Sequence, residues 1–386
     1  MKKALMYASV ASMIAQFNME NIKLLQKLGY QVDVACNFES GSTISSDKVD
    51  ELKNILNSMH INYFHIPLSR NITNIKSLWK AYCLTKQLLN TQHYDLIHCH
   101  SPIGGIVCRV ANKNSNNYCY TKMIYTAHGF HFFKGNNPLK NFLFRNIERY
   151  GAKYTDTLIA INKEDYEAAK KFKLKKQGTV EYVPGVGIDL DKINSIQGNR
   201  EKLINELDIP KDSILLLSVG ELNENKNHRI VIEALPRLPS NIHYLICGIG
   251  LLKDSHFDLA EQLGVDDRLH LLGYKNNIIE TMKSCDIFVF PSKREGLPVA
   301  LMEAIACQLP CIASNIRGNR DLLSGNYDSR LFDLKKDDLA RIILDLVNQP
   351  DEIQHEKNED ILKLISKNHI KKIMTDIYKE ESYAKN

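Results

Sequence analysis

The sequence predicts an α/β protein with two parallel-sheet domains, whose ligand-binding edges would form an interdomain cleft if they face each other. Its 386 residues are about twice the usual length of one domain. Short apolar runs alternate with amphipathic, helix-like stretches, which is the rhythm of an open parallel sheet. The alternation of strands and helices stops at the Pro- and Gly-rich stretch 184–187 and then starts again, so we expect two sheets.

The first domain should alternate strands and helices from its first residues. The apolar run 3–9 (KALMYAS) predicts a strand, and the amphipathic stretch 18–29 predicts the helix after it. The pattern repeats with strands at 31–36, 62–67, 95–100, 122–128 and 157–162 and with helices at 46–59, 77–90 and 104–113.

The second domain repeats the same pattern. Its expected strands, each followed by a helical stretch, are 213–220, 243–250, 269–274, 286–292 and 310–314. We therefore place the N-terminal domain at 1–184 and the C-terminal domain at 185–365. Residues 366–386 should form a C-terminal helix that packs back on the N-terminal domain.

Composition excludes several classes of protein. The 44% hydrophobic and 25% charged residues are typical of a globular protein, and no apolar run has the length of a membrane-spanning helix. The 9 cysteines lack paired spacing, which favours reduced thiols in the cytoplasm. His98-Cys99-His100 looks metal-like, but strand alternation sends Cys99 to the opposite side, so we expect no metal there.

The charge is uneven along the chain. Residues 1–185 contain 24 Lys and Arg against 13 Asp and Glu, whereas the remainder contains 26 against 32. A basic half attracts anionic surfaces such as phosphates, nucleic acid or the inner leaflet of a membrane. Because no nucleic-acid-binding module is recognisable, we do not expect nucleic acid as a partner.

The stretch KREGLPVALMEA (293–304) follows a predicted strand, at the sheet edge where ligands bind. Pro298 suits the first position of a helix, and the N–H groups of Gly296 and Leu297 should point out of the turn, where a helix start binds phosphate. Glu303 is the only charge in an otherwise apolar helix. Its carboxylate needs hydrogen-bond donors such as sugar hydroxyls, or else a strip of solvent.

Lys226 occupies a similar position after the strand 213–220. It lies just before another helix, where its ammonium group can reach phosphate oxygens at the same sheet edge. A plain surface lysine is the alternative.

These motifs resemble glycosyltransferase family four, the retaining, nucleotide-sugar-dependent enzymes of the GT-B type. The resemblance implies two facing Rossmann-like domains with an interdomain cleft. The resemblance covers the C-terminal half through VPGVGIDLDKI, LSVGELNENKNH, YLICGIG, VDDRLHLLGY and PSKREGLPVALMEAIACQLPCIAS, with its E-x7-E spacing. The N-terminal half is similar more loosely, through YASVASM, FNMENIKLL, DLIHCHSP and YTAHGFHF. It looks like the branch that builds capsule, exopolysaccharide or O-antigen units.

The resemblance implies a role for each matching residue. Glu303 would bind the donor ribose, Lys226 would neutralise the diphosphate, and Glu295 would contact the transferring sugar. His128 would reach a donor-sugar hydroxyl and the acceptor side, with a turn histidine as the alternative. The expected catalytic residues are thus Glu295, His128 and Lys226; the donor-binding residues are Glu303, Gly296, Leu297, Pro298, Arg294, Gly220, Asn223, Gly248, Gly273 and Tyr274; the acceptor-binding residues are Ser9, Ser12, Asn18 and His100.

The chain also departs from the family pattern. Glu221 stands where members commonly carry Arg, and Arg294, Lys293 or Arg229 could supply the missing charge. The Gly-Gly pair that many members have after the first strand is absent. No metal cofactor is expected, since Asp189-Leu190-Asp191 imitates a D-x-D motif but lies in a linker that the family uses structurally.

The stretch 130–154 mixes aromatic and basic residues. Either it forms a basic amphipathic surface that lies on an anionic leaflet, or Phe142, Leu143 and Ile147 pack a helix into the core. With the family resemblance, this predicts a cytoplasmic protein in peripheral contact with the inner face of the membrane. Its acceptor would be a saccharide on a polyprenyl diphosphate.

The expected function is retaining, metal-independent transfer of a hexose or N-acetylhexosamine from a UDP-sugar to that acceptor, in cell-surface polysaccharide biosynthesis. One alternative is a nucleotide-sugar epimerase of the same architecture, which needs acidic and histidine residues for proton transfer at a sugar carbon. The other is a non-catalytic nucleotide-sugar-binding subunit, in which Glu221 in place of the usual Arg would indicate that catalysis has been lost.

Overall fold

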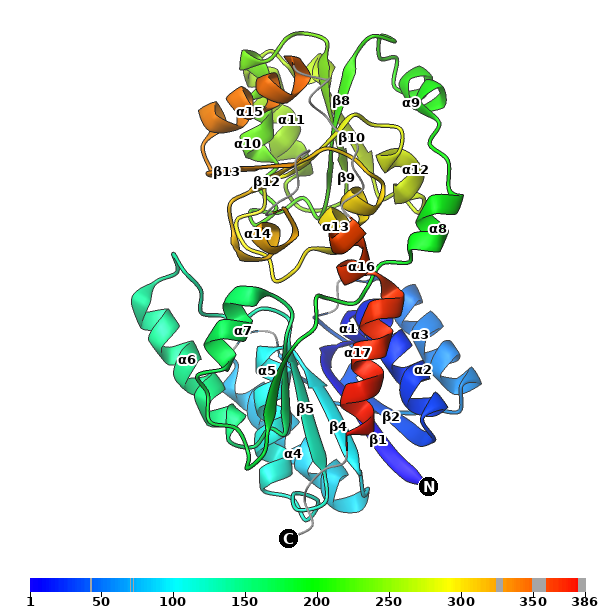
Figure 1. The fold of residues 1–386 in the computed structure, drawn as a ribbon, viewed down its shortest axis with the longest axis vertical. Helices are drawn as coiled ribbons and strands as arrows, with labels where there is room; N and C mark the ends of the chain where they lie inside the picture. The colour runs from blue at the N-terminus through cyan, green and yellow to red at the C-terminus, as the bar shows by residue number, and fades with distance from the viewer. Residues whose placement is uncertain (42–43, 70, 72, 324–328, 349–358, 381–386) are drawn as a thin grey trace. The chain divides into compact units, whose positions relative to one another are not determined.

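The structure is a computed structural model, and it describes residues 1–386 except 42–43, 70, 72, 324–328, 349–358 and 381–386 (Figure 1). The chain divides into two compact units. One comprises Met1–Pro184 with Ile370–Asn386, and the other comprises Gly185–His369. No described helix combines the length and the hydropathy that crossing a bilayer requires.

The N-terminal unit contains a seven-stranded parallel sheet in the order β3-β2-β1-β4-β5-β6-β7, with helices on both faces (Figure 1). Its strands are β1 (Lys2–Val10), β2 (Tyr30–Asn37), β3 (Asn62–His65), β4 (Leu96–His100), β5 (Lys122–Ala127), β6 (Thr157–Ala160) and β7 (Thr179–Tyr182). Its helices are α1 (Ala11–Phe17), α2 (Met19–Lys27), α3 (Ser46–Ser58), α4 (Ile75–Thr91), α5 (Pro102–Lys113), α6 (Pro138–Ala152) and α7 (Lys163–Ala169).

The central strand β1 separates two cores because its side chains alternate between the faces. Ala4 and Met6 belong to one hydrophobic cluster, and Leu5 and Tyr7 belong to another. A strand buried on both faces needs an unbroken apolar run, which KALMYAS provides.

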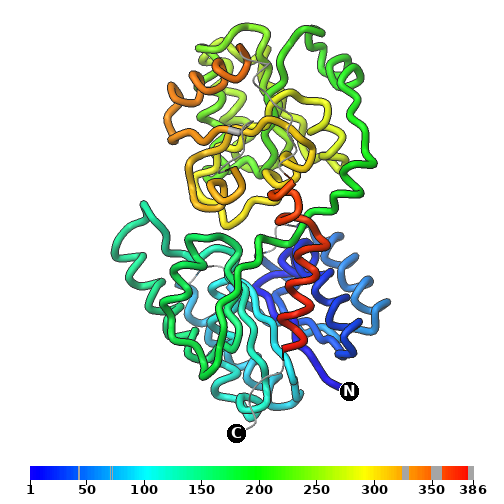
Figure 2. The backbone as a smooth tube through the Cα atoms, in the orientation of Figure 1, coloured from blue at the N-terminus to red at the C-terminus, as the bar shows by residue number. Residues whose placement is uncertain are grey.

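Helix α17 (Lys367–Lys379) returns to the N-terminal unit (Figure 2). Its buried residues Ile370, Met374, Ile377 and Tyr378 join the same cluster as Ala4. At its C-terminus, Lys122 Nζ donates hydrogen bonds to the carbonyls of Ile377 and Glu380, at 2.7 and 2.8 Å. A lysine in that position satisfies carbonyls that have no partner within the helix.

The C-terminal unit contains a six-stranded parallel sheet in the order β10-β9-β8-β11-β12-β13. Its strands are β8 (Ile214–Val219), β9 (Ile242–Cys247), β10 (Leu269–Gly273), β11 (Ile287–Phe290), β12 (Cys311–Ser314) and β13 (Ser329–Phe332). Its helices are α8 (Leu190–Ser195), α9 (Arg200–Glu206), α10 (Arg229–Ile232), α11 (Lys253–Gln262), α12 (Ile278–Met282), α13 (Val299–Ala306), α14 (Arg317–Leu323), α15 (Lys336–Asn348) and α16 (Glu359–Ile365), with short 3₁₀ turns at Leu235–Arg237 and Asp266–Arg268.

The interpretation that Phe142, Leu143 and Ile147 pack α6 into the core is wrong for Phe142 and Leu143, whereas Ile147 is half-buried. Their side chains are 73% and 52% exposed, and Leu139 one turn earlier is 80% exposed. Glu148, about 180° around the helix from Leu139, faces inward and is buried, as are Gly151 and Ala152. It accepts hydrogen bonds from Arg109 (2.9 Å) and from the Tyr125 hydroxyl (2.8 Å). A buried ion pair therefore helps to anchor α6, together with Ala152 and Phe144, which pack in the same cluster as Leu5 and Tyr7.

Candidate functional site

The start of α13 follows the carboxyl end of β11, where the sequence predicts the donor site. The helix begins at Val299, and Pro298 is its N-cap, one residue before the predicted position. No acceptor within the described part of the chain pairs with the backbone N–H of Gly296 or Leu297. Two unpaired amides at the positive end of a helix dipole can bind the oxygens of a phosphate group.

Glu303 lies on the next turn of α13, among apolar neighbours. Burial raises the pKa of its carboxyl to about 7, and the charge of Lys192 on α8 opposes this shift. Among the described residues, no side chain donates a hydrogen bond to this carboxylate. A half-buried carboxylate without a donor is costly unless a ligand supplies one, and hydroxyl groups are suitable donors.

Lys226 and Glu295 form an ion pair beside the helix start. The Nζ to Oε1 distance is 2.7 Å, and the side chains are 22% and 15% exposed. Lys226 Nζ also lies 4.9 Å from the centroid of the Phe290 ring. In this structure each charge is therefore satisfied by the other, and an incoming diphosphate would compete with Glu295 for the ammonium group.

Hydrogen bonds hold the loop of Lys226 against the loop of Glu295. Asn223 Oδ1 accepts from the backbone N–H groups of Asn225 and Lys226, each at 3.0 Å. Asn225 in turn joins the second loop, since its carbonyl accepts from Lys293 N–H and its side chain donates to the Arg294 carbonyl. Asn223 thus organises the loop that carries Lys226.

Three predicted glycines lie at neighbouring strand ends. Gly248 N–H donates to the Gly273 carbonyl at 2.8 Å, and Gly220 N–H donates to the Cys247 carbonyl at 3.0 Å. A Cβ atom at Gly248 would lie 1.8 Å from the Gly220 carbonyl oxygen, so only glycine allows this approach. Tyr274 follows with its side chain 62% exposed. Because the three glycines have no side chains, the backbone of the strand ends is uncovered beside Lys226.

The candidate substitutes for the missing arginine differ in their pairing. Lys293 pairs with Glu224 at 3.5 Å, and Arg229 pairs with Glu233 at 2.7 Å, whereas the Arg294 side chain is exposed.

Arg317 on α14 is a residue that sequence reasoning missed. It is buried, and its Nε donates to the Glu295 carbonyl at 3.1 Å. The Ile-Arg-Gly-Asn stretch after β12 could have indicated Arg317, because ligand-binding residues follow the strands of a parallel sheet. Gly318 lets α14 approach this loop closely, since a Cβ atom there would lie 2.2 Å from the Gly296 carbonyl oxygen. Arg317 therefore brings a cation to the loop between β11 and α13.

The N-terminal unit places the remaining predicted residues near the carboxyl ends of β1, β4 and β5. Ser9 is buried and its hydroxyl lies 3.2 Å from that of Ser101, and Ser12 is also buried. Asn18 is buried at the junction of α1 and α2, where its side chain donates to the Met13 carbonyl. His128 directly follows β5, and its Nε2 lies 3.1 Å from His100 Nδ1.

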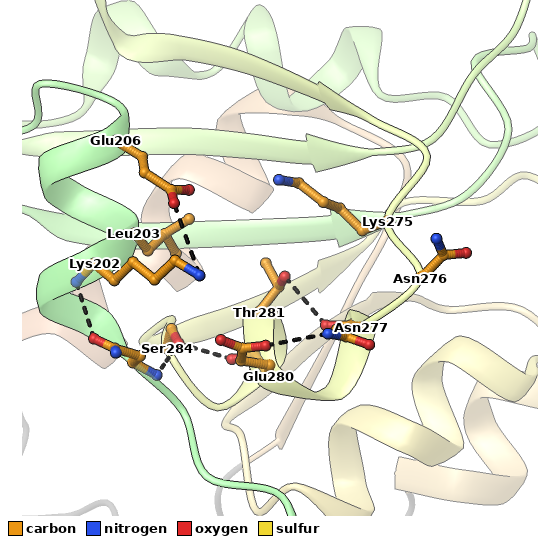
Figure 3. Close-up of a pocket in the computed structure, with 10 residues that line it drawn as sticks. Lys202, Leu203, Glu206, Lys275, Asn276, Asn277, Glu280, Thr281 and Ser284 are labelled. Atoms are coloured by element: carbon orange, nitrogen blue, oxygen red, sulfur yellow. Dashed lines mark hydrogen bonds and ion pairs between the residues drawn. The ribbon is translucent and has the colours of Figure 1, made fainter.

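A pocket of about 260 Å³ in the C-terminal unit contains none of the predicted site residues (Figure 3). Its lining mixes lysine, glutamate and amide side chains, several of which hydrogen-bond to one another. Among the described residues, no group of three or more His, Cys, Asp or Glu side chains could hold a metal ion. Asp189, from the D-x-D sequence, caps α8 by accepting from Lys192 N–H.

Comparisons with known families match both halves of the chain. Residues 199–363 match the family model described as "Glycosyl transferases group 1", and residues 7–162 match the one described as "Glycosyl transferase 4-like". The chain is 32% identical over 327 residues to EpsD of Bacillus subtilis, which is named as a glycosyltransferase. The match covers 83% of this chain and 81% of EpsD. It is also 29% identical to the UDP-Gal:alpha-D-GlcNAc-diphosphoundecaprenol alpha-1,3-galactosyltransferase of Escherichia coli, over 94% and 89% of the two chains.

Solved structures show the same fold. HepE of Anabaena, in complex with UDP and glucose, superposes with a TM-score of 0.75 at 17% identity, over 98% of this chain and 99% of HepE. Sucrose-phosphate synthase from Thermosynechococcus elongatus gives a TM-score of 0.76 at 17% identity, over 98% of each chain. These likenesses confirm the predicted fold class of two Rossmann-like domains.

Proposed function

This chain belongs to the group 1 glycosyltransferases, and we propose that it is a retaining enzyme that transfers a hexose or N-acetylhexosamine from a UDP-sugar to a polyprenyl-diphosphate-linked saccharide. The observation that carries the proposal is the start of α13. There the amides of Gly296 and Leu297, which have no acceptor among the described residues, follow Glu295 of the ion pair with Lys226 and precede the half-buried Glu303 in the chain. This set can bind a diphosphate at its centre and hydroxyl groups at its flanks.

The proposed reaction exchanges one bond at the anomeric carbon of the donor sugar. The bond from this carbon to the diphosphate oxygen breaks, and the acceptor hydroxyl oxygen bonds to the same carbon from the same face. The acceptor proton passes to a donor phosphate oxygen or to Glu295. Lys226 and the helix-start amides stabilise the negative charge that grows on the diphosphate, so the reaction uses no metal.

Two relatives support the choice of substrates. The name of the Escherichia coli relative gives it a UDP-galactose donor and a diphosphoundecaprenol-linked acceptor. A Campylobacter jejuni relative, 29% identical over 199 residues, is named as an N-acetylgalactosaminyltransferase acting on a diphospho-undecaprenol saccharide. For this chain we propose only what the two names share, which is transfer of a sugar to a polyprenyl-diphosphate-linked saccharide, within cell-surface polysaccharide biosynthesis.

A donor and product screen tests this function. The purified chain is incubated with a panel of nucleotide sugars, with and without short polyprenyl-diphosphate saccharides, and the products are analysed by mass spectrometry and NMR. We expect acceptor-dependent release of UDP and a new glycosidic bond with the anomeric configuration of the donor. An epimerised donor without acceptor, or a product with inverted configuration, would contradict the proposal.

A membrane-bound acceptor requires the enzyme to reach the membrane, and we propose that α6 makes this contact on the inner face of an anionic bilayer. At 3.6 residues per turn, Leu139, Phe142 and Leu143 share one exposed side of the helix. Lys140 and Arg149 flank this side and are exposed. Apolar side chains bordered by cations are the pattern of a helix lying in the interface of an anionic leaflet.

Liposome co-sedimentation tests the contact. The wild-type chain should bind anionic vesicles at low salt and bind less as salt rises, because exposed charges are screened. Replacing both Phe142 and Leu143 with serine should weaken binding about tenfold or more, since two apolar anchors are lost. Phe257→Ser is the matched control, because Phe257 is also exposed (44%) but lies on α11 of the C-terminal unit. Equal binding by the wild type and the double variant would contradict the role of α6.

A further inference from the structure

Three histidines form a cluster at the carboxyl ends of β4 and β5. His98 and His100 lie on the same side of β4, with ring centroids 4.0 Å apart. His98 Nδ1 lies 2.8 Å from the Tyr378 hydroxyl on α17, and its Nε2 lies 2.8 Å from the Thr126 hydroxyl. His100 Nδ1 lies 3.1 Å from Nε2 of His128. The cluster thus connects His128, a predicted catalytic residue, to the core of the unit.

The three rings are neutral near pH 7. Burial lowers the pKa of His98 to about 3 and that of His128 to about 4. Burial also holds the pKa of His100 well below its ordinary value, and the other two histidines lower it further. A neutral imidazole carries one N–H and one bare nitrogen, so a partner that can only accept or only donate constrains its tautomer. The hydroxyl partners of His98 can do either and leave its tautomer open.

Met6 on β1 determines the tautomer of His100. The Met6 sulfur lies 3.1 Å from His100 Nε2, and a thioether can accept a hydrogen bond weakly but cannot donate one. Nε2 of His100 therefore carries the proton, and Nδ1 is bare. A bare Nδ1 can only accept, so His128 must donate through its Nε2–H, which leaves Nδ1 of His128 with a free lone pair.

We infer that His100 is a positioning residue that fixes His128 in its Nε2–H tautomer and keeps the Nδ1 lone pair available to a substrate hydroxyl. The role of His128 in the reaction rests on the proposed function, whereas the tautomer of His128 is argued from the contacts of His100 alone. It also gives His100 a role through His128 in place of direct acceptor binding, because the His100 side chain is 1% exposed and both of its ring nitrogens are engaged.

The backbone next to His100 shows that this strand end is held in place. Ser101 has φ 64° and ψ 151°, a conformation that favours glycine. Its N–H donates to the Thr126 carbonyl, and its hydroxyl donates to the His100 carbonyl at 2.6 Å. Backbone strain next to His100 fits a site where orientation matters more than local stability.

Nitrogen-15 NMR of the histidine side chains tests the tautomer directly. In the wild type, His128 should give a protonated Nε2 and a bare Nδ1. In His100→Leu the acceptor is lost, and the His128 signals should shift toward a mixture of tautomers. In His100→Asn the side-chain oxygen can take the place of Nδ1, and the wild-type signals should be largely retained. A wild-type His128 protonated at Nδ1 would overturn the inference.

Turnover provides the second readout. His100→Leu should lower kcat about tenfold or more with a smaller effect on the donor KM, because the wrong tautomer removes the hydroxyl contact of His128 and leaves the proposed donor contacts of α13 intact. His100→Asn should recover most of kcat. The matched control is His243→Leu, since His243 Nδ1 lies 3.0 Å from His270 Nε2 in an equivalent pair outside the site. The melting temperature of each variant shows whether it folds.

The outcomes separate this inference from the proposed function. If His128→Ala is inactive but His100→Leu turns over normally, the role of His100 is wrong and the transferase proposal stands. If His128→Ala turns over normally, the role given to His128 is wrong, and the inference fails with it. Loss of turnover in His243→Leu of the same size as in His100→Leu would show a merely structural effect and would also overturn the inference.

Discussion

Replacing Lys226 with alanine should lower kcat about 10²- to 10³-fold, with a smaller effect on donor binding. The ammonium group opposes a charge that grows on the diphosphate as the sugar leaves, so its loss costs more in the transition state than in the ground state. The variant also leaves the Glu295 carboxylate without its partner at 2.7 Å. Single-turnover kinetics with a saturating donor measure the effect on chemistry.

A second lysine provides the control for this result. Lys202 on α9 lies in the same unit, and its side chain is 60% exposed beside Glu206. Lys202→Ala should leave kcat unchanged, because an exposed ion pair contributes little. If Lys226→Ala retained the wild-type kcat, the diphosphate would not depend on this ammonium group, and the proposed mechanism would be wrong.

Replacing Glu303 with glutamine should stabilise the folded C-terminal unit and weaken donor binding in the same variant. Burial raises the folded-state pKa of Glu303 to about 7, whereas the carboxyl titrates near its ordinary value when unfolded. Between these values the unfolded chain releases a proton that the folded chain retains, so stability falls as pH rises through this window. Above about pH 7 the full cost is about 3 kcal/mol.

Calorimetry measures both consequences. The melting temperature of Glu303→Gln should exceed that of the wild type at about pH 8, and the difference should vanish near about pH 4. Donor affinity of the wild type should be about tenfold weaker at about pH 6 than at about pH 8, because hydroxyl groups donate best to the ionised carboxylate. The glutamine variant should lose this pH dependence. A variant that bound a UDP-sugar as tightly as the wild type would contradict the role of Glu303.

Much of the fold could be predicted because parallel strands are buried on both faces and therefore appear as apolar runs. Strands β1 and β11 are such runs, and the structure contains both of them. The short strands β7 and β13 were not predicted, since neither TVEY nor SRLF is an apolar run. The inward face of α6 includes a buried ion pair between Glu148 and Arg109, and hydrophobic periodicity does not detect such a pair.

Part of the candidate site followed from local sequence, and part required tertiary structure. The helix start after β11 could be predicted because turn, proline and apolar helix are contiguous. The Lys226–Glu295 pair joins residues 69 positions apart, and the buried Arg317 reaches Glu295 from 22 positions away. The orientation of His100 depends on Met6, which is 94 positions away. Sequence spacing alone cannot indicate such contacts.

A crystal structure of the chain with UDP tests the central claim most directly. The account predicts that the diphosphate accepts hydrogen bonds from the amides of Gly296 and Leu297, that Glu303 contacts the ribose hydroxyls, and that Lys226 Nζ turns from Glu295 toward a phosphate oxygen. A diphosphate bound away from the start of α13, with Lys226 still paired to Glu295, would contradict it.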